Sequence, residues 1–327
     1  MSKIAVIFNG GTISMKVDER IKAAVPSLTG HEIMAMVTGI DGFAEIETST
    51  FSTLPSPHMT PELMFELRTY IQSILDRDDI TGVVVTHGTD TLEETAFFLD
   101  LTLENDKPVV ITGAMRNGSE LGYDGPANLA ASICTAASEK ARGRGVLVCF
   151  NGELYCASEV TKINSMSLNA FGSPNLGPIG IVDSNMVIFY RDSIRKQHID
   201  IDGLHARVDL IKCVSGMDCD IIDYYLQKGT NGLVVEGTGR GNVPPALVEP
   251  IKKAISSGVP VVVVSRCFQG RVLDSYGYPG GGKDIRNLGV IFGDILPGQK
   301  ARIKLLVALS KTRDMGEIKK FFETELY

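Results

Sequence analysis

Two glycine-containing turns in this chain each carry a threonine hydroxyl directly after an apolar run. The run IAVIF at residues 4–8 leads into the turn NGGT, which ends at Thr12, and the run GVVVT leads into HGTDT at residues 87–91. An open α/β sheet places its chemistry at the carboxyl ends of buried strands, where glycines let a ligand approach the backbone. With Lys162 further along the chain, the two turns predict a hydrolase that uses a threonine nucleophile.

The residue types in these turns suggest a division of roles. Thr12 is the candidate nucleophile, because two glycines leave its loop free of crowding side chains, but its hydroxyl reacts poorly until a partner removes its proton. Asp90 can accept hydrogen bonds or bind a ligand ammonium group, and Thr89 can orient a water molecule. Lys162 either stays charged as an electrostatic support or loses its proton and acts as a base.

Each feature also has a simpler structural interpretation. A Gly-Gly-Thr turn alone serves as a tight connection between a strand and a loop, Asp90 can act only in helix capping, and an isolated Lys162 is typical of a surface. Because three such coincidences in one α/β chain are less expected than one site, their joint appearance favours catalysis.

Strand-like runs rich in Val and Ile alternate with amphipathic helical patterns, and this order positions the turns. Strands are predicted at 3–8, 44–49, 82–87, 108–113, 146–150, 208–213, 232–236 and 259–265. Helices are predicted at 61–75, 92–103, 126–141, 244–256 and 299–309. The alternation predicts an α/β fold of two domains, a larger amino-terminal one with a mostly parallel sheet flanked by helices and a smaller carboxy-terminal α/β domain.

Domain boundaries follow from a charged, irregular stretch between the two halves of the pattern. We expect an amino-terminal domain at 1–190 that holds the candidate nucleophile and the Thr-Asp-Lys group, a connector at 191–207, and a carboxy-terminal domain at 208–327. Two helix starts carry capping signals. Thr60 precedes a proline, and Thr91 with Glu94 has the spacing of a capping box, whose helix dipole would point at a ligand beside Thr89.

The composition excludes several classes of protein. The 327 residues carry a net charge of -7 without a basic cluster interleaved with aromatics, which argues against a nucleic-acid partner. No apolar run is long enough to span a membrane, and the opening MSKIAVIF reads as a strand rather than a secretory signal, so we expect a cytoplasmic protein. The 6 cysteines and 5 histidines lack metal-ligand spacing, and no dinucleotide fingerprint follows the first strand.

Longer stretches of the chain resemble the bacterial asparaginase/glutaminase family. They are FNGGTIS, VVVTHGTDTLEETAFFLDLT, KPVVITGAMR, DGPANL, RGVLV, EVTKIN and PGQKARIKLLVALS, and the similarity covers essentially the whole chain. The resemblance implies a two-domain α/β fold and a homodimer or homotetramer whose active site is completed across the dimer contact. It also implies conversion of L-asparagine to L-aspartate and ammonia without metal or cofactor, with L-glutamine hydrolysis as a side activity.

The resemblance also assigns roles to residues of this chain. Thr12 resembles the primary nucleophile, which forms an acyl-enzyme that water hydrolyses. Thr89, Asp90 and Lys162 resemble a second triad, in which the aspartate also holds the substrate's α-amino group, and the Gly11 and Thr89 amides are the implied oxyanion donors. The other implied substrate contacts are Ser56 for the α-carboxylate, backbone groups of Gly88 and Ala114, and Asn242 near the neighbouring subunit's substrate.

Three positions depart from the family pattern. Asn9 replaces a threonine, with a small expected effect because its side chain can still hydrogen-bond. Pro57 stands where family members often have a polar residue that helps to bind the substrate. Because proline lacks an amide proton and a polar side chain, we expect weaker substrate binding or altered selectivity for the length of the substrate's side chain. No tyrosine occurs between Ile13 and Gly30, where many members have one, so we hypothesise that Tyr276 supplies the hydroxyl that orients or activates Thr12, the alternative being a loop tyrosine that packs at a dimer contact.

Two other functions remain alternatives to L-asparagine hydrolysis. One is hydrolysis of another small amide, such as D-asparagine or glutamine, because of the proline and the missing loop tyrosine. The other is a non-catalytic amino-acid-binding sensor on the same fold. Binding alone has no use for two activated hydroxyls, so the sequence favours an amidohydrolase.

Overall fold

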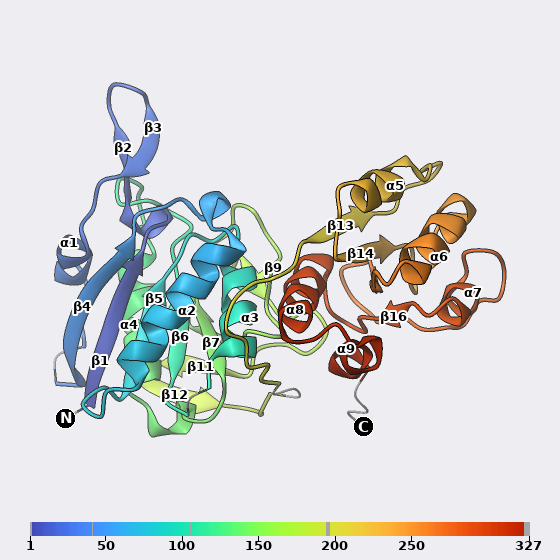
Figure 1. Cartoon of the computed structure of the whole chain (residues 1–327). Coiled ribbons are helices and arrows are strands. Elements are labelled where there is room, and N and C mark those ends of the chain that lie inside the picture. Colours follow the sequence, from blue (N-terminus) through green and yellow to red (C-terminus); the bar gives the residue numbers. More distant parts are fainter. Residues whose placement is uncertain (1, 41, 105, 194–196, 324–327) are drawn as a thin grey trace. The chain divides into compact units, whose positions relative to one another are not determined.

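The computed structural model describes residues 2–323 except residues 41, 105 and 194–196. The chain forms two compact units, Met1–His198 and Ile199–Tyr327. Figure 1 shows the helices and strands of each unit. Residues 194–196, which belong to the expected connector, lie outside the described part of the chain.

An 8-stranded sheet is the framework of the first unit, in the order β12-β11-β8-β7-β6-β5-β1-β4. The parallel part consists of β4 (Ala44–Ser52), β1 (Ser2–Asn9), β5 (Gly82–Thr86), β6 (Val109–Thr112) and β7 (Val146–Phe150). Antiparallel pairing then adds β8 (Glu153–Cys156), β11 (Gly180–Asp183) and β12 (Met186–Phe189). Because both faces of the parallel strands are covered, β5, β6 and β7 are buried throughout.

Helices cover both faces of this sheet. The helices that contact it are α1 (Gly30–Ala35), α2 (Pro61–Leu75), α3 (Leu92–Thr102) and α4 (Gly125–Ala136). On one face, Ile33 of α1 and Leu129 of α4 share a core with Ile4, Val6 and Phe8 of β1. The helices α2 and α3 contact each other, and α2 lies over the strands in Figure 1.

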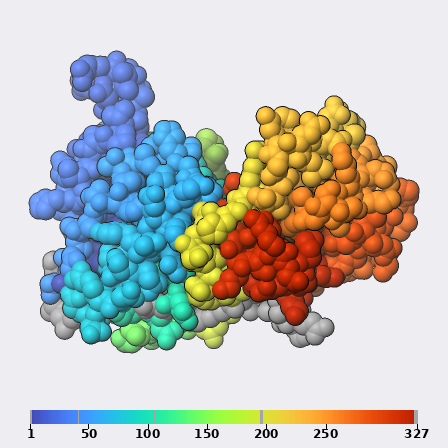
Figure 2. Space-filling view, in the orientation of Figure 1, coloured from blue at the N-terminus to red at the C-terminus, as the bar shows by residue number. Residues whose placement is uncertain are grey.

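Two short hairpins stand apart from the large sheet. The first, β2 (Met15–Asp18) with β3 (Ala23–Pro26), follows the 3₁₀ helix η1 (Thr12–Ser14) and projects from the body of its unit in Figures 1 and 2. The second pairs β9 (Thr161–Lys162) with β10 (Phe171–Gly172). Lys162 therefore lies on a strand that is not part of the main sheet.

The second unit has a 4-stranded parallel sheet in the order β13-β14-β15-β16. Its strands are β13 (Val208–Lys212), β14 (Gly232–Gly237), β15 (Val261–Ser265) and β16 (Ile291–Phe292). Its helices are α5 (Asp220–Gln227), α6 (Val248–Ser256), α7 (Gly282–Asn287), α8 (Gly298–Lys311) and α9 (Met315–Phe322). Helix α8 packs against β13, β14 and β15.

The predicted fold class is confirmed, since each predicted strand and helix has a counterpart at nearly the same residues. The predicted helix at 126–141 is wrong in its last turn. Helix α4 ends at Ala136, extended backbone at Ser138 (φ -84°, ψ 124°) interrupts it, and a 3₁₀ turn η3 (Glu139–Ala141) follows. None of the helices in the described residues combines the length and apolar content needed to cross a bilayer.

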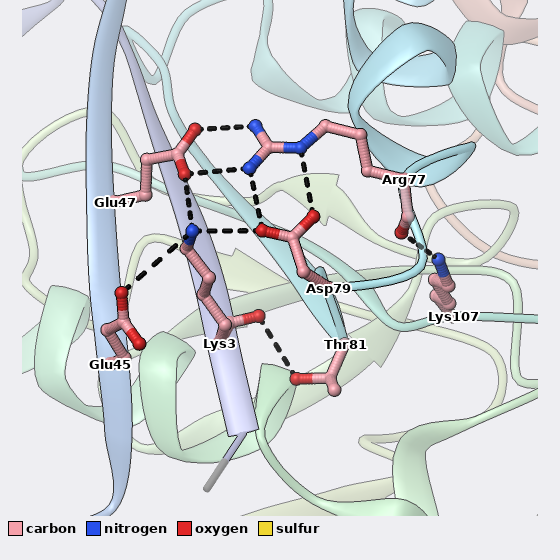
Figure 3. Close-up of polar contacts among 7 residues, drawn as sticks. All are labelled: Lys3, Glu45, Glu47, Arg77, Asp79, Thr81 and Lys107. Atoms are coloured by element: carbon pink, nitrogen blue, oxygen red, sulfur yellow. Dashed lines mark hydrogen bonds and ion pairs between the residues drawn. The ribbon is translucent and has the colours of Figure 1, made fainter.

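A charged network ties the beginnings of β1 and β4 to the loop after α2 (Figure 3). Arg77 donates to Glu47 at 2.6 and 2.9 Å and to Asp79 at 2.9 Å, and Lys3 donates to Asp79 at 2.9 Å. Hydrogen bonds from Arg77 and Lys3 lower the pKa of Glu47 to about 2. The Lys107 ammonium donates to the carbonyls of Leu75 and Arg77, which caps the end of α2. The network lies at the amino ends of the strands, and we assign it to stability.

Candidate active site

The strand order brings the predicted site loops to one edge of the large sheet. The strands β4, β1, β5 and β6 are adjacent and parallel, so their carboxyl ends share this edge. Ser56 follows β4, Thr12 follows β1, Thr89 follows β5 and Ala114 follows β6. This edge is where open α/β sheets bind ligands.

The turn after β1 requires glycine at two positions. Gly10 and Gly11 have φ angles of 72° and 86°, in a region that L side chains rarely adopt. The Gly11 amide donates to the carbonyl of Leu54 at 3.1 Å, and a Cβ on Gly10 would lie 2.3 Å from the same oxygen. The chain then enters η1, whose first residue is the half-buried Thr12.

The two threonine-bearing turns pack against each other. Phe8 of β1 lies opposite Thr86 of β5, so the turns leave the sheet at the same level. A Cβ on Gly11 would lie 2.4 Å from both the Cα and the amide nitrogen of Gly88. The backbones of the two turns are therefore in direct contact, which only glycine permits at this point.

The structure brings Thr89, Asp90 and Lys162 together. The Lys162 ammonium donates to the Thr89 hydroxyl at 2.9 Å and to the Asp90 carboxylate at 2.7 Å. Thr89 is buried and the lysine side chain is mostly so, whereas the Asp90 side chain is 62% exposed. The group thus offers a buried hydroxyl next to a cation, with an accessible carboxylate that can accept a ligand's ammonium group.

Ser56 is fixed against the same turn from the β4 side. It begins the 3₁₀ helix η2 (Ser56–His58), and its hydroxyl accepts the Asp90 amide at 3.2 Å. A Cβ on Gly88 would lie 2.8 Å from the Ser56 side chain, so these residues are in close contact. The serine is buried, and its hydroxyl lies beside the backbone amide of the residue that carries the accessible carboxylate.

The predicted capping box at Thr91 is wrong. Thr91 is the N-cap residue of α3, but its side chain makes no capping hydrogen bond. Its φ and ψ of -120° and 15° differ from the β-region angles that aim a cap side chain at the helix. The hydroxyl instead donates to the Ser56 carbonyl at 2.8 Å, which joins η2 to the start of α3. The N-cap predicted at Thr60 is confirmed, since its hydroxyl accepts the Leu63 amide.

The side chain of His87 stabilises the second turn through hydrogen bonds. Its ring is buried, with Nδ1 2.8 Å from the Gly88 carbonyl and Nε2 2.9 Å from the Thr95 hydroxyl. A carbonyl only accepts, so Nδ1 carries the proton and Nε2 accepts from the threonine. Burial lowers the pKa of His87 to about 4, so the ring is neutral at pH 7.

This histidine predicts acid sensitivity. Its pKa falls from 6.5 to about 4 on folding, so between these pH values the unfolded chain binds more protons and stability declines as the pH falls. We expect His87→Asn, which retains a donor toward Gly88, to remove this component. The pH dependence of the unfolding free energy measures it, and the native-minus-variant difference should change by roughly 3 kcal/mol between pH 7 and 4. Parallel curves would contradict the assignment.

Ala114 lies at the end of β6, next to the second turn. It is buried and follows Gly113, where a Cβ would lie 2.4 Å from the His87 carbonyl and 3.4 Å from a methyl group of Thr89. The Gly113 carbonyl accepts the side-chain amide of Asn128 at 3.0 Å. The backbone that was predicted to contact a ligand is thus held beside Thr89.

Two predicted site residues belong to the second unit. The role of Tyr276 beside Thr12 and that of Asn242 near a neighbouring subunit's substrate stay predictions. Tyr276 is 44% exposed, and its ring packs against Tyr278 with centroids 5.6 Å apart. The Asn242 side-chain oxygen accepts the Gly282 amide at 3.1 Å.

A tyrosine that was overlooked in the sequence reaches the turn of Thr12 within the first unit. The Tyr123 hydroxyl donates to the carbonyl of Ile13, the residue after Thr12, at 2.5 Å. Burial, and then the charge of Asp124, raise the pKa of Tyr123 well above its usual range, so the phenol acts as a donor rather than a base. Its place after a predicted strand, in the loop before DGPANL, was the available signal.

Comparisons with known proteins agree along the whole chain. Residues 3–195 match the family model "Asparaginase, N-terminal", and residues 207–322 match "Glutaminase/Asparaginase C-terminal domain". The chain is 35% identical to L-asparaginase of Bacillus licheniformis, covering 95% of this chain and 97% of that protein. It is 30% identical to glutaminase-asparaginase of Pseudomonas aeruginosa, covering 98% and 90%.

A solved structure is similar in fold as well as in sequence. The probable cytoplasmic L-asparaginase of Campylobacter jejuni superposes with a TM-score of 0.88 at 32% identity, covering 98% of this chain and 99% of that one. Both units have matching family models, and the full-length relatives share about a third of their residues with the chain. This protein is therefore a member of the asparaginase family.

Proposed function

We propose that this protein hydrolyses the side-chain amide of L-asparagine to give L-aspartate and ammonia through an acyl-enzyme on Thr12. The observation that supports it most directly is the contact between the Gly11 and Gly88 backbones. It holds the turn of Thr12 against the turn of Thr89, whose hydroxyl receives the Lys162 ammonium. A small amide between these turns faces two hydroxyls, a cation and an accessible carboxylate.

The proposed reaction has two steps. The Thr12 hydroxyl loses its proton and its oxygen attacks the amide carbon, the carbon–nitrogen bond breaks, and the nitrogen leaves as ammonia after taking up a proton. Water then adds to the resulting ester, L-aspartate is released and the threonine hydroxyl is restored. The Thr89 amide stabilises the oxyanion in both steps, and Lys162 supports the charge that develops near Thr89. The Gly11 amide, which the family resemblance implied as a second donor, already donates to the Leu54 carbonyl at 3.1 Å, so that expectation is wrong in this structure.

Substrate recognition is assigned to groups around the second turn. Asp90 accepts the α-ammonium group through its exposed carboxylate, and Ser56 binds the α-carboxylate. Backbone groups of Gly88 and Ala114 complete the pocket. Pro57 has no amide proton to offer a ligand, so we propose weaker discrimination of side-chain length and a side activity on L-glutamine. The Pseudomonas relative named glutaminase-asparaginase supports this extension.

We also propose a homodimer or homotetramer located in the cytoplasm, as the description of the Campylobacter relative suggests for the compartment. A neighbouring subunit would bring Asn242 to the substrate of its partner. We also propose that residues 1–190 and 208–327 form the two domains and that residues 191–207 connect them.

Ammonia release from purified protein tests the proposed function. L-asparagine is the expected best substrate in a panel with D-asparagine, L-glutamine and D-glutamine. Tight binding of an amino acid without ammonia would favour the sensor, and preferential release from D-asparagine would favour the shifted amidohydrolase. Both alternatives are thus distinguished by binding and turnover in one set of measurements.

Two tyrosine variants test which phenol supports Thr12. Tyr276→Phe is expected to lower kcat if this residue orients or activates the nucleophile, and unchanged turnover would remove it from the catalytic residues. Tyr123→Phe loses its hydrogen bond to Ile13, and a fall in kcat of roughly 5- to 10-fold corresponds to one neutral hydrogen bond. Steady-state kinetics on L-asparagine, with thermal unfolding as the control for folding, measures both.

A further inference from the structure

Lys162 is carried by a short hairpin outside the main sheet. It lies on β9, which pairs with β10 in a 2-stranded sheet separate from the main one. The hairpin is anchored near Phe171, whose ring packs on Phe150 at 4.8 Å and whose carbonyl accepts the Tyr155 hydroxyl at 3.2 Å. These anchors hold the β10 side, and the Ile163 amide ties β9 to it by donating to the Ala170 carbonyl at 2.7 Å.

Glu93 supplies a tether on the lysine side. It lies in the first turn of α3, and its Oε1 accepts the backbone amide of Lys162 at 3.2 Å. The same helix begins directly after Thr89 and Asp90. One carboxylate therefore connects the backbone of Lys162 to the helix that begins just after Thr89 and Asp90, the two residues that its ammonium contacts.

The environment of Glu93 is unusual for a residue that serves stability alone. It is only 5% exposed, and its Oε2 has no hydrogen-bond partner among the described residues. A buried carboxylate oxygen without a donor costs free energy, so its retention calls for an explanation. The positive end of α3 offsets part of this cost, but it does not account for the specific bond to Lys162.

We propose that Glu93 is the positioning residue for Lys162, a role that rests on the proposed function. By holding the β9 backbone against α3, it delivers the ammonium between the Thr89 hydroxyl and the Asp90 carboxylate. Without it, β9 shifts and the ammonium lies too far from at least one of them. Glu93 from α3 then accepts the backbone amide of Lys162, and Asp90 from the preceding turn accepts its ammonium.

Substitutions at Glu93 give distinct expectations. Glu93→Ala removes the acceptor, and a displacement of about 1 Å at the ammonium is expected to lower kcat for L-asparagine by roughly 100-fold with a smaller change in KM. Glu93→Gln keeps an oxygen for the Lys162 amide and should retain at least roughly a tenth of native kcat. Glu94→Gln, the same substitution one residue further along the helical turn, is the matched control and should leave kcat unchanged.

A double-mutant cycle separates positioning from a merely structural role. Because Glu93 acts through Lys162, Glu93→Ala should change the residual rate of Lys162→Ala by less than about 3-fold. Equal losses in both backgrounds, or native kcat in Glu93→Ala, would overturn the inference while leaving the proposed function in place. Native turnover in Lys162→Ala would instead contradict the proposed function. Thermal unfolding of each variant identifies losses that come from misfolding.

Discussion

Replacing Thr12 by alanine is expected to lower kcat for L-asparagine by roughly 10⁴-fold or more, the scale seen when a covalent nucleophile is removed. The half-buried side chain lies at the start of η1, so its loss should leave the fold intact. Ammonia release measures the rate, and thermal unfolding within roughly 2 °C of the native protein would show that folding is preserved.

Two companion variants sharpen this result. Thr12→Ser keeps a hydroxyl and should retain measurable turnover, because the attacking atom is still present. Thr89→Val removes the hydroxyl that receives the Lys162 ammonium and should also abolish most activity. Undiminished ammonia release by both Thr12→Ala and Thr89→Val would mean that the active site lies elsewhere.

The second large effect is expected at Gly11, where a single methyl group should separate the two turns. A Cβ there would lie 2.4 Å from Gly88 backbone atoms, and the φ of 86° already disfavours any L side chain. We expect Gly11→Ala to lower kcat by more than roughly 100-fold, because the turns of Thr12 and Thr89 can no longer make contact. The variant should also unfold several degrees below the native protein.

Gly177 provides a matched control for the energetic cost of placing an L side chain in a left-handed backbone conformation. Its φ of 73° is similar, but nothing lies within 4 Å of a Cβ built on it. Gly177→Ala should therefore cost only the roughly 1–2 kcal/mol of a left-handed backbone, with native kcat. If Gly11→Ala behaved like Gly177→Ala in both kinetics and thermal unfolding, the close contact of the turns would not matter for catalysis.

Most of the fold followed from local patterns in the sequence. Apolar runs such as 82–86 could be recognised because strands buried on both faces are continuously hydrophobic. The antiparallel strands β8, β11 and β12 were overlooked, since each has only 4 residues. Strands this short are set by the partners they pair with rather than by their own composition.

The candidate site also contains some residues that could be predicted from the sequence and others that were missed. Thr12, Thr89 and Asp90 could be selected because they lie in glycine-containing turns directly after apolar runs, and Lys162 because it could join them as a cation or a base. Tyr123 and Glu93 were overlooked. A tyrosine in a loop after a predicted strand is only a weak signal, and a glutamate in a first helical turn is ordinary in sequence. Their importance comes from one hydrogen bond each, to Ile13 and to Lys162.

The sequence by itself determined which chemistry is available and which family the chain resembles, because reactive side chains, glycine turns and hydrophobic periodicity are local properties. Only the tertiary structure decided that the turn after β1 touches the turn after β5 and that Lys162 reaches both Thr89 and Asp90. The order of strands in a parallel sheet is fixed by packing between segments far apart in the chain, and no local pattern encodes it.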